Sequence, residues 1–275
     1  MALLRYLFEG ERVRRRRIAE NHVKIVGGYE CEPHSQPWMA FLKASFHQCG
    51  GFLINQNWIL SAAHCYDTRI EVRLGKHNVA VDERSEQSIL SERAIRHPQF
   101  NYATLDNDIM LIKLSKPATL NEFVKPVDLP RSCAPPDTMC RVSGWGVTMN
   151  DAVDSDKLQC LNLSIISDRD CNKSYPGLIT ASMFCAGCLE GGKGVCQGDS
   201  GGPMLCDGDI QGIVSAGGHR CAAENQPGIF TKQIILQLTD WQALYSHFVL
   251  SMCADSVWQL KTSLNRRKLL RVNSV

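Results

Sequence analysis

Three segments of the chain contain residue types that could act together in acyl transfer. A histidine can take the proton of a serine hydroxyl, and a carboxylate can hold that histidine in the correct tautomer. Each segment alone is weak evidence, because a histidine after two alanines is more often packed in a core and Gly-Asp-Ser-Gly is often only a tight turn. Together they predict a general base, an orienting carboxylate and a nucleophile. In chain order these residues are His64, Asp108 and Ser200.

The elements that must position these residues have the pattern of short strands. Apolar or alternating runs recur between turn signals, and their length and β-branched content favour strands over helices. Many short strands without a repeat period predict an all-β chain, built as a barrel or a sandwich. The clearest runs are Trp38–Leu42, Gly51–Ile54, Trp58–Leu60, Ile70–Leu74, Ile109–Ile112 and Ile210–Val214.

Length and composition exclude several protein classes. The chain has 275 residues, of which 44% are hydrophobic and 21% charged, and this excludes a disordered, collagen-like or coiled-coil chain. No apolar run reaches the roughly 18 residues of a membrane span. Residues 1–24 and 254–275 each carry +4, so the rest of the chain carries −6. An acidic body argues against a nucleic-acid-binding protein.

The cysteine content indicates the compartment. Thirteen cysteines are more than a cytosolic enzyme usually carries, so we expect a secreted, extracellular protein. The first residues do not support a signal peptide, because Arg5 interrupts a short apolar cluster and Glu9 follows it. The odd number leaves at least one thiol without an intramolecular disulfide partner.

Four further motifs accompany the three reactive residues. With them, the chain resembles the trypsin/chymotrypsin family of serine proteases from about Ile25 to Lys232, and its pattern is most similar to that of vertebrate trypsins. The resemblance implies two six-stranded antiparallel β-barrels with the active site between them. It also implies an endopeptidase that hydrolyses peptide bonds through an acyl-enzyme. The motifs are Ile25–Gly28, Cys49–Gly51, Ser143–Gly146 and Tyr175–Gly177.

The chain divides into three expected parts. Apolar residues from Trp241 to Val249 recur at helical spacing, which predicts a C-terminal helix that packs on the body. The expected parts are an N-terminal extension or propeptide with an imperfect signal (1–24), a protease domain (25–253) with barrels at about 25–127 and 128–235 and the helix at about 239–252, and a basic tail (254–275).

The resemblance assigns further residues to catalysis and activation. The backbone N–H groups of Gly198 and Ser200 would stabilise the oxyanion. Cleavage after Lys24 would free the α-ammonium group of Ile25, which would pair with the carboxylate of Asp199 and complete the oxyanion hole. The acidic run that precedes this lysine in trypsins is absent. We therefore expect a Lys-directed protease other than the usual digestive activator.

The specificity pocket departs from the trypsin pattern. Gly194 stands where trypsins have an aspartate, and Val195 stands where they have a serine, while Gly217 and Gly228 keep the walls open. Without a carboxylate, a desolvated substrate cation loses its partner, so we expect cleavage after Leu, Met, Phe or Tyr. Ala216 replaces a tryptophan that forms the floor beneath the substrate, which predicts weak substrate binding.

The loop that binds calcium in trypsins is also altered. Asn78, Val81, Glu83 and Glu86 keep the pattern, but Lys76 replaces the first carboxylate ligand. Calcium needs six to eight oxygen ligands, whereas an ammonium can occupy the place of the cation and pair with both glutamates. We therefore expect no bound calcium, no other metal and no cofactor.

Family pairing implies five disulfide bonds. Three cysteines remain outside that scheme: Cys133, Cys188 and Cys253, of which Cys188 is expected to be free and a Cys133–Cys253 bond is an open alternative. The expected bonds are Cys31–Cys160, Cys49–Cys65, Cys140–Cys206, Cys171–Cys185 and Cys196–Cys221.

The expected partners follow from the resemblance. They are protein or peptide substrates, a Lys-directed activating protease and protease inhibitors, with no nucleic acid, no membrane span and a monomeric chain. One alternative is a catalytically weak or inactive binding protein on the same fold, because the pocket and the substrate floor have lost specific contacts. A second is that both ends are gene-model artefacts around a real protease.

Overall fold

The computed structural model of the chain describes residues 25–45, 47–128, 132–146, 156–218 and 220–232. The expected N-terminal extension with Lys24, the helix at about 239–252, the basic tail and Cys253 lie outside the described residues.

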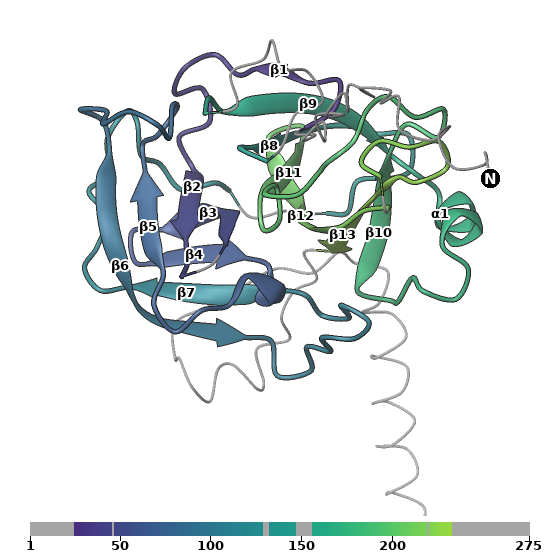
Figure 1. Ribbon diagram of the computed structural model, residues 1–275, viewed down its shortest axis with the longest axis horizontal. Coiled ribbons are helices and arrows are strands. Elements are labelled where there is room, and N and C mark those ends of the chain that lie inside the picture. Colours follow the sequence, from purple (N-terminus) through teal and green to yellow (C-terminus); the bar gives the residue numbers. More distant parts are fainter. Residues whose placement is uncertain (1–24, 46, 129–131, 147–155, 219, 233–275) are drawn as a thin grey trace, which may run out of the picture.

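The first half of the chain forms a closed antiparallel barrel (Figure 1). Its strands follow one another in space as β2-β3-β4-β7-β6-β5. The apolar runs expected at Trp38–Leu42, Trp58–Leu60 and Ile109–Ile112 fall on three of these strands. The strands are β2 (Met39–Lys43), β3 (Gln48–Asn55), β4 (Trp58–Ser61), β5 (Glu71–Leu74), β6 (Gln87–Arg96) and β7 (Met110–Leu114).

The second half forms another closed antiparallel barrel, because β8 pairs with both β9 and β11 and so joins the two ends of the sheet. Two six-stranded barrels confirm the fold that the family resemblance implies. The strands are β8 (Met139–Gly144), β9 (Gln159–Ile165), β10 (Met183–Gly187), β11 (Pro203–Cys206), β12 (Asp209–Ala216) and β13 (Gly228–Lys232).

The short first strand belongs to the second barrel. β1 (Tyr29–Glu30) falls in the range 25–127 expected for the first barrel, but its residues pair with β9. The adjacent Cys31–Cys160 disulfide holds the chain there. The N-terminal end of the domain therefore crosses to the barrel that carries the serine.

One α-helix is present among the described residues, α1 (Asp168–Ser174), at the outer edge of the second barrel (Figure 1). Ser167 caps it by accepting a hydrogen bond from the backbone N–H of Asp170, and acidic residues fill its first turn. A turn of 3-10 helix, η1 (Ala63–Cys65), follows β4. It carries His64.

Side chains from the second barrel pack into the apolar core of the first. The core of the first barrel is built on side chains such as Phe52 and Ile112, which are fully buried. Leu205, Ile210 and Ile213, from β11 and β12 of the second barrel, pack into the same cluster. This shared packing fixes the two barrels against each other, and residues of both line one cavity.

Candidate active site

His64 and Asp108 are held together at the edge of the first barrel. The Nδ1 atom of His64 lies 2.7 Å from Oδ2 of Asp108, and the backbone N–H of His64 donates to Oδ1 at 2.9 Å. The carboxylate is fully buried, whereas the imidazole is 22% exposed. Since an ionised carboxylate only accepts hydrogen bonds, Nδ1 carries the hydrogen and Nε2 is left as a base.

Ser200 lies on the loop between β10 and β11 and faces the same cavity as His64. The loop is fixed by backbone hydrogen bonds from Gly50 to Ser200 at 2.8 Å and from Gly201 to Val214 at 2.8 Å. A side chain at Gly201 would lie 2.2 Å from the hydroxyl of Ser61, so only glycine fits there. Within the described residues no hydrogen bond joins Ser200 to His64, and such bonds often tighten only when substrate binds.

The expected oxyanion donors lie in the same cavity. Gly198 has a φ of +91°, which favours glycine, and a Cβ there would lie 3.0 Å from the Cα atom of Gly146. In the part of the chain that the structure describes, no hydrogen bond uses the backbone N–H of Gly198 or of Ser200. Both donors are therefore available to a substrate oxygen.

Asp199 points away from the cavity into the second barrel and is fully buried. Its two oxygens accept hydrogen bonds from the backbone N–H groups of Gly146 at 2.8 Å and Cys196 at 2.9 Å. Ile25 is 2% exposed and belongs to the core of this barrel, while Val26 forms a backbone bridge with Gly194. The structure thus places both residues of the expected activation pair in the second barrel.

Two hydroxyl groups near Asp108 were missed by the sequence analysis. Ser215 donates to Oδ2 of Asp108 at 2.6 Å, and Thr231 donates to its backbone carbonyl at 2.9 Å. Both come from the second barrel, on β12 and β13. No local motif marks them, since Ser215 is separated from Asp108 by 107 positions. They bind the side chain and the backbone of Asp108 to strands of the second barrel.

The residues expected to form the specificity pocket differ in solvent exposure. Gly194, Val195 and Gly228 are buried, whereas Gly217 is exposed. A Cβ at Gly228 would lie 2.9 Å from Cγ2 of Val195, and one at Gly194 would lie 3.2 Å from the backbone of Ala222. The valine side chain therefore packs against Gly228.

All five expected disulfides are present in the structure. The Cys49–Cys65 bond joins β3 to η1 and so fixes the turn that carries His64. Cys133 is also disulfide-bonded, and Cys188 is a free thiol.

Among the described residues, one group of potential metal ligands lies together: the ligand atoms of Cys49, His64 and Cys65 are within 4.8 Å of one another. Its two sulfurs are bonded to each other, so they are not available to a metal. In the same residues, no helix is long and apolar enough to cross a membrane.

Comparison with known proteins agrees with this geometry. The Trypsin family matches residues 25–241. Trypsin-2 of Salmo salar is 61% identical over 218 residues, which cover 79% of this chain and 93% of that protein. Trypsin-10 of Gadus morhua is 56% identical over 213 residues, covering 78% and 88%. Anionic trypsin of Canis lupus familiaris is 54% identical over 219 residues, covering 79% and 87%. The chain therefore belongs to the trypsin family and is a serine endopeptidase.

Proposed function

We propose that hydrolysis proceeds through an acyl-enzyme on Ser200. Its Oγ atom bonds to the carbonyl carbon while its proton passes to Nε2 of His64, and the N–H groups of Gly198 and Ser200 stabilise the oxyanion. The C–N bond then breaks as His64 returns the proton to the leaving amine. Water repeats the two steps and releases the acid. The observation that supports this role most directly is the 2.7 Å contact between Nδ1 of His64 and the buried carboxylate of Asp108.

We also propose that cleavage after Lys24 activates the enzyme. The new α-ammonium group of Ile25 then pairs with Asp199, whose carboxylate already accepts two backbone N–H groups. A buried carboxylate gains strongly from a cationic partner. The burial of Ile25 in the second barrel supports this proposal, and the activator is a Lys-directed protease.

For specificity, we propose that the enzyme prefers Leu, Met, Phe or Tyr before the scissile bond. Gly194 supplies no carboxylate, and the buried Val195 side chain adds apolar surface beside Gly228. A lysine or arginine side chain entering this pocket would lose its hydration without gaining an ion pair. The enzyme works without a cofactor, acts as a monomer on protein or peptide substrates, and is open to protease inhibitors.

The disulfides support secretion. Five bonds among the described cysteines are stable only in an oxidising compartment. We therefore propose an extracellular site of action. The net charge of −6 on residues 25–253 argues against nucleic acid as a partner.

The test uses the full chain, cleaved after Lys24 by a Lys-specific protease. We expect a fluorophosphonate probe to label Ser200, and Leu and Phe esters to be hydrolysed faster than Arg and Lys esters. Ser200→Ala and Lys24→Gln are the controls for labelling and for activation. Faster hydrolysis of Arg or Lys esters would contradict the proposed specificity but not the mechanism.

A second candidate function is a catalytically weak or inactive binding protein on the same fold. The observation that favours it is Ala216, which is only partly buried, packs against the cluster of Cys171, Met183, Cys185 and Ile229, and offers little surface to a substrate. Failure of the fluorophosphonate probe to label Ser200 after cleavage would support this function over catalysis.

A further inference from the structure

The loop between β5 and β6 carries the positions that bind calcium in trypsins. Asn78, Val81, Glu83 and Glu86 still present oxygens there, so the loop retains most of the expected donors. The fit to calcium depends on Lys76, because this residue replaces a carboxylate ligand with a cation. Its surroundings decide whether a divalent ion and an ammonium group can share the loop.

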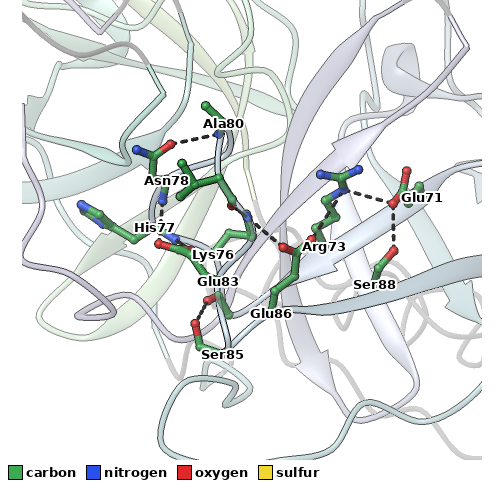
Figure 2. Close-up of polar contacts among 12 residues, drawn as sticks. Glu71, Arg73, Lys76, His77, Asn78, Ala80, Glu83, Ser85, Glu86 and Ser88 are labelled. Atoms are coloured by element: carbon green, nitrogen blue, oxygen red, sulfur yellow. Dashed lines mark hydrogen bonds and ion pairs between the residues drawn. The ribbon is translucent and has the colours of Figure 1, made fainter.

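The Lys76 side chain is fully buried and turns into the loop, as Figure 2 shows. Its Nζ atom donates to the backbone carbonyl of Val81 and, at 2.8 Å, to Oε2 of Glu86. Both acceptors are positions that would otherwise face calcium. A buried ammonium needs a charge partner and hydrogen-bond acceptors, and the loop provides both.

Glu83 is used differently from our expectation. Its two oxygens accept the backbone N–H groups of His77 at 2.7 Å and Asn78 at 3.1 Å (Figure 2). Among the described residues it forms no ion pair with Lys76, so the expected pairing with both glutamates is wrong for this one. The Glu83 carboxylate instead binds backbone N–H groups of the same loop, because these two donors lie nearer to it than the Lys76 ammonium group does.

Glu86 has a second cationic neighbour. Nε of Arg73 lies 3.7 Å from its Oε1 atom, while Lys76 binds the other oxygen. With one oxygen beside an arginine and the other on an ammonium, this carboxylate is neutralised by the chain itself. The residues present do not fit calcium, because a divalent cation would lie against a buried positive charge and would lack one carboxylate.

We propose that the Lys76 ammonium group is a permanent replacement for the calcium ion, so that the folded state of this protein does not depend on calcium. The conformation of this loop matters to the second barrel, because the loop residue His77 accepts hydrogen bonds from it. The carbonyl oxygen of His77 accepts hydrogen bonds from Nε1 of Trp145 at 3.0 Å and from the backbone of Leu158 at 2.9 Å. Lys76 therefore stabilises the contact of His77 with Trp145, whose neighbour Gly146 donates a hydrogen bond to Asp199.

Thermal unfolding of the full chain tests the proposal, in a Ser200→Ala background that prevents self-digestion. Its melting temperature is measured in millimolar calcium and in excess chelator, with calcium binding followed by titration calorimetry. We expect the Lys76 protein to melt at the same temperature in both and to show no saturable calcium binding. Lys76→Glu should melt several degrees lower in chelator, and calcium should restore it, because the ligand set is again complete.

Lys76→Met keeps the apolar stem but removes the charge. We expect it to melt lower in both conditions without rescue by calcium, because it leaves Glu86 with less compensation and supplies no ligand. Lys116→Glu, a charge reversal at an exposed position, is the matched control and should change neither value. Stoichiometric calcium binding by the Lys76 protein, or an unchanged melting temperature of Lys76→Met, would overturn the proposal.

Discussion

The carboxylate of Asp108 has three donors: the side chain and backbone of His64, and the hydroxyl of Ser215. A fully buried carboxylate is stable as an ion only when such donors surround it. The shortest of the three contacts is the one from Ser215, at 2.6 Å. Ser215 is thus a positioning residue, which acts on His64 through Asp108.

Removing this hydroxyl with Ser215→Ala should lower kcat/KM roughly 10- to 100-fold, because a hydrogen bond to a charged group contributes about 1.5–3 kcal/mol. Since Ser215 does not line the cavity of His64 and Ser200, the loss should fall on kcat while KM stays nearly unchanged. Ser88→Ala, which removes an exposed hydroxyl that donates to Glu71, is the control. A rise in KM with an unchanged kcat would show that Ser215 does not act through Asp108 and His64.

At the scale of elements, the segment before β7 is bound to the segment before β10. Oδ1 of Asp106 accepts hydrogen bonds from the hydroxyls of Thr180 and Ser182, both at 2.6 Å. Burial acts to raise the pKa of the Asp106 carboxyl, but the hydroxyls of Ser182 and Thr180 outweigh it and lower the pKa below its ordinary value. These bonds tie the two barrels together two residues before Asp108.

A group whose pKa is lower in the folded state stabilises the fold above its unfolded pKa, and this stabilisation is lost as the pH falls through the folded value. Asp106→Asn should therefore destabilise the protein at pH 7, and the difference from the parent should shrink below about pH 4. Urea unfolding at a series of pH values measures this difference in the free energy of unfolding. Asp128→Asn, at an exposed position, is the control, and a pH-independent difference would contradict the assignment.

The sequence allowed some elements to be predicted and hid others. Runs such as Trp58–Leu60 are buried along their whole length and stand out as apolar. β6 (Gln87–Arg96) has only one buried residue, Ile89, so neither an apolar run nor alternation marks it, although it pairs with β5 and β7. Its existence depends on its neighbours, which a local pattern does not report.

The same distinction holds within the site. The residue types of the triad were predictable, because short motifs surround His64, Asp108 and Ser200. The hydroxyl of Ser215 and the backbone contacts of Glu83 were not, since they depend on how loops and strands distant in sequence are brought together. Contacts of this kind follow from packing rather than from spacing.

At the scale of the whole molecule, the two barrels share one apolar cluster. Leu205, Ile210 and Ile213 belong to the second barrel but pack with the core of the first, and Ile210 and Ile213 are fully buried. Two barrels that were joined only by polar contacts could unfold independently of each other. Because strands of the second barrel supply side chains to the core of the first, we expect the barrels to unfold as one unit.

Calorimetry and far-ultraviolet circular dichroism should accordingly show a single coincident transition. Ile213→Ala should move that transition as a whole, with a loss of about 2–5 kcal/mol in the free energy of unfolding. Leu178→Ala removes a side chain of the same size that is 63% exposed, and it should have little effect. Two transitions, of which the substitution shifts only one, would contradict the shared core.

Trp145 lies between two features described above. Its indole is 2% exposed and binds the carbonyl of His77, while its neighbour Gly146 donates to Asp199. No tryptophan among the described residues lines the cavity of His64 and Ser200. Trp145 is one of five tryptophans in the chain, and its share of the intrinsic fluorescence should therefore report on the surroundings of Asp199. A stopped-flow record of its emission after cleavage at Lys24 would follow activation in real time, without an added dye.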